Sequence, residues 1–538
     1  MKLNQSSVIS SDLQEDGYQL PQFDITAVKE KTLSEPTWLQ LGAGNIFRAF
    51  LGSCQQKLLN DDVADTGIIV AEGYDYEIVD VLRAYDFLTI NVKLKANGAV
   101  EKEVIGSIVD YLKMDTCSED FSRMQSIFES ESLQMVSLTI TEKGYRLIDN
   151  KGAIQSAVLH DFVHGPLQPV SYLGKLASLL VKRFEAGAFP LALVSMDNMS
   201  HNGEKLRHSI LRFVDEWQNR GLVSQAFACY VKDDRKITFP WSMIDKITPR
   251  PDLTVQQMLE KSGLTDMAPV TTDKHTFVAP YVNGEETQYL IIEDAFPNGR
   301  PALDKAGVIF TTRETVNAVE TMKVSTCLNP LHTALAIFGC LLGYDSIHKE
   351  MTDDSLVALI KRLGYQEGLP VVTDPKILNP KAFIDEVINV RLPNPFIPDT
   401  PQRIATDTSQ KLSARFGETL KAYVTKDRDI SSLEAIPLVF AGWLRYLTGI
   451  NDKGESFEIS TDPLGDTLLP KFAEFQFGEQ TISDEIINLL KDTSIFSVNL
   501  YDIGIAEKVI AYYQQMCIQA GSIQNVLEKF MENERRND

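Results

Sequence analysis

Three polar side chains stand in a stretch that is otherwise apolar, VETMKVSTCLNPLHTALAIFGCLLGY: Lys323, Asn329 and His332. Burial among apolar neighbours disfavours a charged lysine and lowers its pKa toward neutrality, which suits a general acid or base. Asn329 and His332 are three residues apart and share one face if the stretch is helical. Pro330 fits best in a first helical turn, so Asn329 is a candidate N-cap. The alternative for Lys323 is an ordinary surface lysine.

A second stretch, WLQLGAGNIFRAFLGSCQQKLLND, reads as an apolar strand, a Gly42-Ala43-Gly44 turn and an amphipathic helix. Such a turn brings backbone N–H groups and a helix N-terminus to a pyrophosphate. The third glycine of the usual fingerprint is replaced by Phe47, so a plain strand-to-helix turn is the alternative. The residues expected to contact the cofactor here are Gly42, Gly44, Asn45, Ile46 and Phe47.

Glu72 ends the next apolar run, GIIVAE, 28 positions after Gly44. An acidic residue at this point hydrogen-bonds the ribose 2′-OH of NAD and disfavours the 2′-phosphate of NADP. We therefore expect NAD as the cofactor. A solvated carboxylate at a strand end is the alternative, and Asp75 competes for the same role.

A third stretch, LALVSMDNMSHNG, is an apolar strand that ends at Asp197 and Asn198. Polar groups at the carboxyl end of a parallel strand stand where α/β folds bind ligands. The alternative is an Asx turn followed by a helix N-cap, which suits Asn202 better than Asn198.

Two cations, Arg403 and Lys411, lie in RIATDTSQKLSARF, after the Pro-rich loop 391–403. Eight residues are slightly more than two helical turns, so both side chains reach one cleft if the segment is helical. A helix break at 406–409 is equally compatible with the sequence, and solvated charges are the alternative.

The elements that must position these residues follow a clear order along the chain. Short β-type runs at 38–41, 67–71, 135–140, 191–195 and 289–294 alternate with helical stretches, which is the βαβ signature of a mostly parallel sheet. After the Pro- and Gly-rich segment 296–307, helical periodicity dominates, as in SLVALIKRLGY and EIINLLKD. The sequence predicts an α/β fold with an N-terminal extension at 1–36, a Rossmann-type doubly wound domain at 37–310 and a mostly α-helical C-terminal domain at 311–538.

Composition narrows the class of partner. The 538 residues are 44% hydrophobic with a formal charge of −22, so nucleic acid and anionic membranes are unfavourable partners. The six cysteines show no CxxC spacing and the N-terminus lacks the apolar core of a signal peptide, which indicates the cytoplasm. The longest apolar run, 331–344, is shorter than a membrane span and predicts a buried core helix.

These segments resemble, in this order, the polyol-specific long-chain dehydrogenase (mannitol dehydrogenase) family. The resemblance extends from about 37 to 450 and includes TITEKGY (139–145), MIDKITPRP (243–251) and EDAFPNGRP (293–301). It implies a metal-independent enzyme with Lys323 as general acid/base, Asn198 and Asn329 holding the developing oxyanion, and His332 hydrogen-bonding the substrate. Arg403 and Lys411 match positions that contact substrate, and Asp245 is given a supporting role.

The spacing departs from the family pattern at one point. Family members place the lysine five residues before the asparagine, whereas Lys323 is six before Asn329. One extra residue turns a helix by about 100°, so the sequence predicts either a helical bulge or a shifted register.

The resemblance implies an NAD-dependent oxidoreductase that interconverts a keto sugar acid and its polyol acid, with fructuronate and mannonate as the expected pair. Mannitol with fructose, or tagaturonate, are the alternatives within the family. A non-catalytic NAD-binding protein on the same fold is the alternative outside it. Zinc-dependent dehydrogenases are disfavoured because no Cys or Cys/His cluster is present. The expected partners are a small-molecule substrate and, in a small homo-oligomer, further copies of the chain; a monomer is equally compatible.

Overall fold

The computed structural model describes residues 1–9, 11–478 and 482–537. The chain divides into two compact units, Met1–Asn317 and Ala318–Asp538. The division falls inside helix α13 (Arg313–Met322), a few residues beyond the boundary near 310 that the sequence indicates. The sequence placed that boundary from the Pro- and Gly-rich segment 296–307 and from the helical periodicity that follows it, and this periodicity begins with α13.

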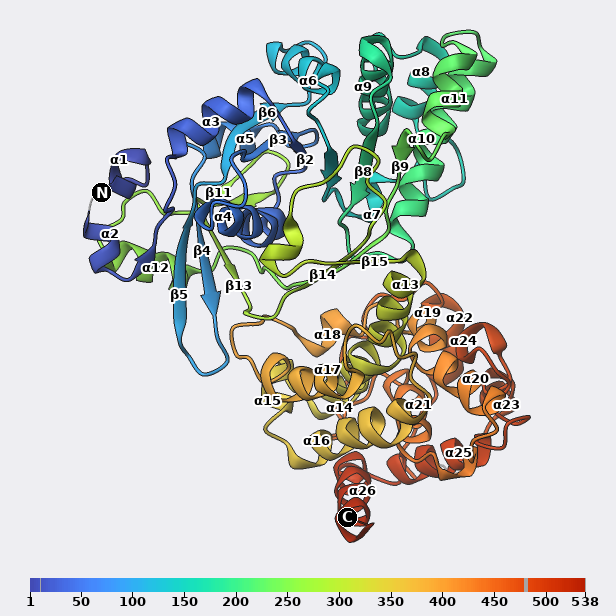
Figure 1. The fold of residues 1–538 in the computed structure, drawn as a ribbon. Coiled ribbons are helices and arrows are strands. Elements are labelled where there is room, and N and C mark those ends of the chain that lie inside the picture. The colour runs from blue at the N-terminus through green and yellow to red at the C-terminus, as the bar shows by residue number, and fades with distance from the viewer. Residues whose placement is uncertain (10, 479–481, 538) are drawn as a thin grey trace. The chain divides into compact units, whose positions relative to one another are not determined.

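A six-stranded sheet with exclusively parallel neighbours forms the centre of the first unit (Figure 1). Numbered in chain order within this sheet, the strands run 3-2-1-4-5-6, the Rossmann arrangement. The predicted runs at 38–41, 67–71, 135–140 and 191–195 are all strands of this sheet. The strands in spatial order are β6 (Ile108–Lys113), β3 (Ile68–Glu72), β2 (Trp38–Leu41), β7 (Met135–Leu138), β8 (Leu191–Ser195) and β9 (Ile237–Thr238).

Alternate residues of each strand enter two separate hydrophobic cores, one on each face of the sheet. In β3, Ile68 and Val70 join the core that contains Phe47, whereas Ile69 and Ala71 join the core that contains Phe128. Both faces are therefore covered, which explains why the strands are continuous apolar runs. The helices of this unit are η1 (Phe47–Leu51), η2 (Leu303–Ala306), α1 (Gln5–Ile9), α2 (Ser11–Glu15), α3 (Ile25–Ser34), α4 (Gly52–Asn60), α5 (Glu77–Arg83), α6 (Glu119–Glu129), α7 (Thr141–Gly144), α8 (Ser156–His164), α9 (Tyr172–Gly187), α10 (Asn202–Asn219), α11 (Gln225–Lys232) and α12 (Leu253–Lys261).

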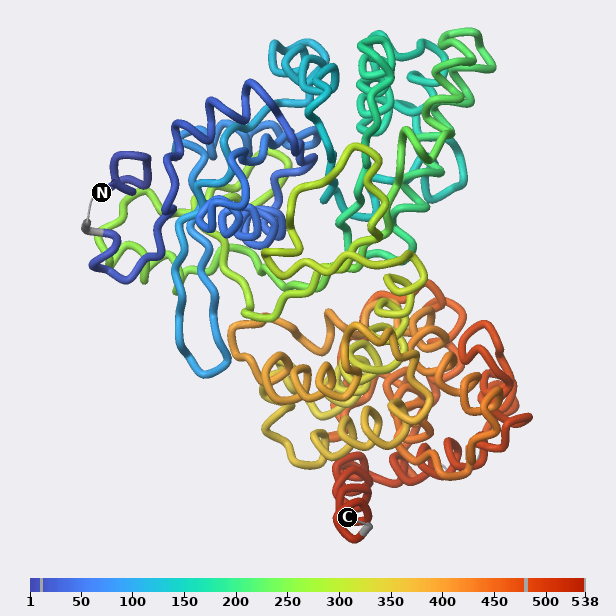
Figure 2. The backbone as a smooth tube through the Cα atoms, viewed as in Figure 1, coloured from blue at the N-terminus to red at the C-terminus, as the bar shows by residue number. Residues whose placement is uncertain are grey.

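Smaller sheets complete the first unit. The N-terminal segment supplies β1 (Tyr18–Gln19), which pairs with β5 (Val100–Ile105) in a sheet ordered β1-β5-β4-β13. Figure 2 shows the long hairpin of β4 (Thr89–Leu94) and β5. The remaining short strands are β10 (Ser242–Asp245), β11 (Val270–Thr271), β12 (Phe277–Val278), β13 (Tyr281–Gly284), β14 (Tyr289–Glu293) and β15 (Ile309–Thr311).

The run at 289–294 is a strand, as predicted, but it lies outside the six-stranded sheet. As β14 it pairs antiparallel with β10 and parallel with β15. A buried apolar run has the same sequence pattern whichever sheet it joins. The sequence therefore predicted the strand but not the strands it pairs with.

The second unit is helical. Its elements are η3 (Lys323–Cys327), α14 (Asn329–Leu342), α15 (Ile347–Glu350), α16 (Asp354–Lys361), η4 (Arg362–Gly368), η5 (Leu369–Val371), α17 (Pro380–Glu386), η6 (Val387–Arg391), α18 (Pro401–Ile404), α19 (Thr408–Leu412), η7 (Ser413–Gly417), α20 (Glu418–Thr425), η8 (Ile430–Ser432), α21 (Ala435–Tyr446), α22 (Gly465–Leu468), η9 (Leu469–Phe472), α23 (Asp484–Leu489), α24 (Thr493–Phe496), α25 (Ala506–Met516) and α26 (Ser522–Asn537). The core helices α14 and α21 pack against each other.

The predicted core helix at 331–344 is confirmed by α14, whose side chains are nearly all buried. Within the described ranges, one continuous helical stretch, 313–342, is long and apolar enough to cross a membrane by length and composition. In its most apolar window 83% of the residues are buried inside the protein, as in a core helix.

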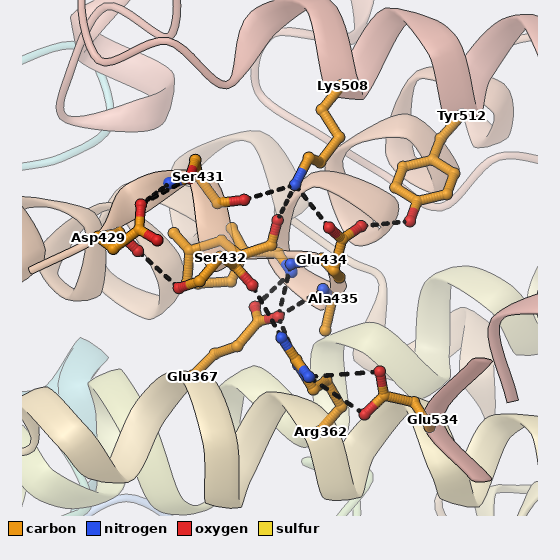
Figure 3. A network of polar contacts seen from close by, with 12 residues as sticks. Arg362, Glu367, Asp429, Ser431, Ser432, Glu434, Ala435, Lys508, Tyr512 and Glu534 are labelled. Carbon is orange, nitrogen blue, oxygen red and sulfur yellow. Dashed lines mark hydrogen bonds and ion pairs between the residues drawn. The ribbon is translucent and has the colours of Figure 1, made fainter. Parts of the chain in front are cut away.

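A carboxylate from a neighbouring helix caps α21 (Figure 3). Glu367, which is 1% exposed, accepts hydrogen bonds from the backbone N–H groups of Glu434, Ala435 and Ile436 at 2.7, 2.7 and 2.9 Å. Arg362 donates to the same carboxylate at 3.2 Å. The N-cap residue of α21 makes no side-chain capping bond, so Glu367 satisfies N–H groups that would otherwise be unpaired.

Candidate active site

The glycine turn after β2 has the geometry that the sequence predicts. Gly42 has φ +98°, and a Cβ on it would lie 2.3 Å from the carbonyl oxygen of Thr139, just beyond β7. A Cβ on Gly44 would meet nothing within 4 Å. Gly42 is therefore required because a neighbouring backbone approaches closely. Gly44 leaves open space in which a ligand can approach the protein backbone.

Glu72 is built into this turn and is not a solvated strand end. Its side chain is 6% exposed, and Oε2 accepts from the backbone N–H of Ala43 at 2.9 Å. Oε1 accepts from the N–H groups of Tyr74 and Asp75 at 2.8 and 3.2 Å. The carboxylate therefore fixes the glycine turn to the loop after β3. The competing carboxylate, Asp75, is itself buried and accepts from the hydroxyl of Thr272 at 2.6 Å.

A cavity of about 610 Å³ opens beside these residues. It lies at the carboxyl ends of β2, β3 and β7, where the strand order reverses and α/β folds bind dinucleotides. The glycine turn, the buried acid and the open space beside Gly44 together fit the phosphates and ribose of a dinucleotide. The lining includes Gly42, Gly44, Glu72, Thr139, Ser171 and Tyr172.

The three residues after the turn differ in what they present. Asn45 accepts from Nη2 of Arg48 at 2.8 Å and donates to the carbonyl of Pro249 at 3.3 Å. Ile46 packs partly against the core. The Phe47 side chain is fully buried in that core, so only its backbone is available to a cofactor. A large apolar side chain replaces the third glycine because it packs inward under the helix.

Asp197 joins the ends of β7 and β8. Its carboxylate accepts from the backbone N–H groups of Ile140 and Thr141, both at 2.9 Å, and from the Tyr145 hydroxyl at 2.6 Å. Burial raises the pKa of Asp197, and these three hydrogen bonds oppose the rise. Asn198 is the next residue and is exposed, so the carboxylate holds the loop that presents it.

The alternative interpretation, in which Asn202 is an N-cap, is wrong. Helix α10 begins at Asn202, His201 occupies the N-cap position, and no side chain caps the helix. The buried Asn202 amide donates to the carbonyls of Asp197 and Ser242 at 3.0 and 2.9 Å, and its oxygen accepts from the Ser242 N–H at 3.0 Å. It links the end of β8 to β10, which ends in the buried Asp245.

Lys323 begins a π-helical turn in the second unit. The Leu328 N–H donates to the Lys323 carbonyl at 3.1 Å, a bond five residues long. A π-turn absorbs one extra residue without changing the helix on either side. Of the two predicted alternatives, a helical bulge or a shifted register, the structure shows the bulge, which takes up the extra residue between Lys323 and Asn329. The Lys323 side chain is 3% exposed, so the surface alternative is wrong.

Asn329 and His332 both lie in α14, with Pro330 in its first turn as predicted. Asn329 is the first helical residue and Leu328 the N-cap, with no capping side chain, so the N-cap expectation is wrong by one residue. The π-turn runs directly into α14 and leaves no extended residue for a cap to use.

His332 is held neutral by its surroundings. Burial and four neighbouring cations, Arg415, Arg391, Arg403 and Lys411, lower the pKa of His332 to about 3. Its Nε2 lies 3.3 Å from Oδ2 of Asp399 but has no partner in hydrogen-bond geometry within the part of the chain that the structure describes.

Of the two possibilities that the sequence leaves open between the two predicted cations, a continuous helix or a break, the structure shows the break, at 405–407. Helix α18 ends at Ile404, α19 begins at Thr408, and Asp407 between them has φ +55°. Arg403 pairs with Asp399 and is 60% exposed. The Lys411 ammonium donates to the carbonyl of Ile404 at 3.4 Å and to that of Thr406. Both cations nevertheless lie near enough to His332 to lower its pKa.

The sequence interpretation missed Arg415 and Asp399. Arg415 stands four residues after Lys411, so a helical reading places both on one face. Asp399 is in the Pro-rich loop four residues before Arg403 and was available as its partner. Opposite and like charges at this spacing were the signal.

A Rossmann unit with a dinucleotide pocket, joined to a helical unit with a buried lysine and a neutral histidine, defines a dinucleotide-dependent oxidoreductase. Residues 36–305 match the Mannitol dehydrogenase Rossmann domain, and residues 315–517 match the Mannitol dehydrogenase C-terminal domain. The chain belongs to the mannitol dehydrogenase family.

Three relatives illustrate the range of similarity. The D-mannonate oxidoreductase of Thermotoga maritima is 47% identical over 99% of this chain and 100% of its own length. A Mannitol 2-dehydrogenase of Phaeosphaeria nodorum is 28% identical over 86% of this chain and 77% of its own. The structure of Pseudomonas fluorescens mannitol 2-dehydrogenase, a ternary complex with NAD and D-mannitol, is 25% identical with a TM-score of 0.70 over both full chains.

Proposed function

We propose that the protein reduces the keto sugar acid fructuronate to mannonate with NADH. The observation that carries this proposal is the group of cations around His332, which a neutral polyol does not require. Identity supports the same choice, because one relative named for mannonate is 47% identical over nearly the full length of both chains, whereas two relatives named for mannitol are 28% and 25% identical.

The cations counter the charge of the whole chain. With a formal net charge of −22, the protein repels anions at long range, so an anionic substrate needs a strong local positive field. A carboxylate taken from water into a site also needs charged hydrogen-bond donors. Arg403 and Lys411 are proposed as part of that field at the substrate end of the helical unit.

His332 suits a substrate hydroxyl. A neutral imidazole carries one donor and one acceptor, and the pKa near 3 keeps it neutral at physiological pH. Its Nε2 is buried and lacks a hydrogen-bond partner among the described residues, which a bound sugar hydroxyl would supply.

Lys323 is proposed as the general acid. It is buried in the π-turn next to α14, and the family resemblance gives it this role. Bound NADH supplies the hydride to the carbonyl carbon. Lys323 delivers a proton to the carbonyl oxygen, while amide N–H groups of Asn329 and Asn198 donate to the same oxygen. Asp245 is proposed in a supporting role.

Glu72 is proposed to select NADH. An ionised carboxylate has about four acceptor positions, and three are occupied by backbone N–H groups. The fourth is available to a ribose 2′-OH, and the charge repels a 2′-phosphate.

An NADH-oxidation screen against fructuronate, tagaturonate, fructose and fructose 6-phosphate tests the proposal. We expect the highest kcat/KM with fructuronate. A higher value with fructose would replace the proposal with mannitol 2-dehydrogenase activity, and no oxidation with any substrate would favour a non-catalytic NAD-binding protein. Metal independence is part of the proposal, so activity should survive exhaustive treatment with a chelator.

The proposed compartment is the cytoplasm, supported by six cysteines that are all free thiols. A monomer or small homo-oligomer is proposed, and sedimentation velocity distinguishes the two.

A further inference from the structure

The cations near His332 differ in what they already bind. Arg403 has a carboxylate partner in Asp399, and Lys411 donates to two backbone carbonyls. Arg415, on the π-turn η7, has neither kind of partner. Its Nη1 donates to the Thr333 hydroxyl, and within the described residues no carboxylate forms an ion pair with it.

We propose that Arg415 is the residue that binds the substrate carboxylate and so sets the preference for a sugar acid; this inference rests on the proposed function. Burial lowers the pKa of Arg415 to about 10, which still leaves it charged at physiological pH. A guanidinium that is partly removed from water without an anion is costly, and an entering carboxylate removes that cost. Arg415 therefore has the charge, the partial burial and, among the described residues, the missing counter-ion of an anion site.

Thr333 fixes the guanidinium beside the other site residues. Its hydroxyl donates to the Asn329 carbonyl at 2.8 Å and accepts from Arg415. Thr333 follows His332 directly in α14, and it is 1% exposed. The turn η7 also packs against η3, which carries Lys323. Arg415 is thus anchored among the residues proposed to handle the reacting carbonyl.

The free donors match a carboxylate. Arginine has five N–H donors in a planar fork, and Nε and Nη2 of Arg415 have no hydrogen-bond partner among the described residues. These two atoms form the edge that makes two parallel bonds to a carboxylate. Fructuronate carries its ketone and its carboxylate toward opposite ends of one six-carbon chain, so one end can meet Arg415 while the other meets Lys323.

The test compares Arg415→Gln with Arg403→Gln, each assayed with fructuronate and with fructose. Arg415→Gln should lower kcat/KM for fructuronate by about 30-fold to a few thousand-fold, mainly by raising KM. It should change kcat/KM for fructose by less than about threefold. Arg403→Gln should lower kcat/KM for fructuronate only a few-fold, far less than Arg415→Gln, because Arg403 is exposed and already paired with Asp399. Arg415→Lys should give an intermediate loss, because it keeps the charge without the fork.

A second readout separates binding from structure. If Arg415 is held for a ligand, Arg415→Gln should leave the Tm of the ligand-free protein unchanged or higher. A lower Tm would mean that Arg415 supports the fold, which would overturn the inference. Thr333→Val, with Thr333→Ser as control, removes the hydroxyl that holds Arg415 and keeps the positive charge. It should lower kcat/KM for fructuronate more than kcat/KM for fructose.

The outcomes distinguish the inference from the proposed function. If the wild type reduces fructuronate but Arg415→Gln affects fructuronate and fructose equally, or neither, the carboxylate is bound elsewhere and only the inference is wrong. If the wild type prefers fructose, the proposed function is wrong and the inference fails with it.

Discussion

Replacing Glu72 by Gln should affect both cofactor choice and the stability of the glycine turn. The carboxylate accepts three backbone N–H groups, from Ala43, Tyr74 and Asp75. A glutamine can keep its oxygen toward Tyr74 and Asp75, but its NH2 group then faces the Ala43 N–H. Two donors oppose each other in that arrangement, and the opposite rotamer loses two bonds instead of one.

The smallest expected loss is therefore one charge-assisted hydrogen bond, about 1.5–3 kcal/mol. In a unit of this size such a loss lowers Tm by about 2–5 °C. The carboxylate charge also repels a 2′-phosphate by roughly 1–4 kcal/mol at contact distance, depending on the local dielectric. Its removal should narrow the preference for NADH over NADPH by about tenfold or more. Because Ala43 is in the turn, KM for both cofactors should rise.

The assay is kcat/KM for NADH and NADPH with saturating keto acid, together with Tm by differential scanning fluorimetry. Asp75→Asn is the matched control, because Asp75 lies in the same loop and cavity wall but bonds Thr272. It should leave the cofactor preference unchanged. An unchanged preference in Glu72→Gln, or a larger change in Asp75→Asn, would refute the reasoning and assign the selectivity to Asp75 or to neither residue.

Four further changes have defined outcomes. Lys323→Ala should lower kcat by about 10²–10⁴ with NADH binding largely intact, measured by stopped-flow kinetics and fluorescence titration, and added amines should partly restore turnover if the role is proton transfer. The pKa of His332 in the folded protein is below its ordinary value, so the free energy of unfolding should fall by up to ~1.4 kcal/mol per pH unit as pH decreases from about 6.5 toward 3. Urea unfolding at several pH values should show that His332→Gln lacks this pH dependence. Glu350 is buried, both its carboxyl oxygens lack a partner among the described residues, and burial raises its pKa well above the usual value. The free energy of unfolding should therefore fall as pH rises above about 4.5. In thermal unfolding at pH 8, Glu350→Gln should be more stable than the wild type. Glu367→Ala should lower the free energy of unfolding by at least about 3 kcal/mol because it removes the cap of α21. A loss of less than about 1 kcal/mol, measured by urea unfolding, would contradict that role.

The parts of the fold that followed from the sequence depend on local patterns. The strands of the parallel sheet are buried on both faces, so each is a continuous apolar run that can be recognised alone. The glycine turn was also predictable, because Gly42 occupies a backbone conformation that L side chains rarely adopt. The pairing of β14 with β10 was not, since partner choice depends on distant segments.

Helix ends were less predictable than helices. Asn202 and Asn329 both have the residue type and position of an N-cap, yet both lie one residue inside their helices. The competing factor is tertiary structure: the Asn202 amide binds Ser242 of another strand, and a π-turn leads into Asn329. Side-chain propensity at a helix end is worth about 1 kcal/mol, which such contacts readily exceed.

The cations near His332 show why a sequence can reveal only part of a site. Arg403 and Lys411 were found because they match a family motif, but their position relative to each other did not follow from the sequence, since the helix between them is broken at Asp407. Arg415 was not singled out, although within the described residues its guanidinium bonds a hydroxyl and no carboxylate. Paired charges and unpaired charges look identical in a sequence, and only the folded chain shows which cation lacks an anion. That distinction matters for function, because a guanidinium already paired in the free protein must give up its partner before it can bind a substrate, whereas an unpaired one gains the full interaction.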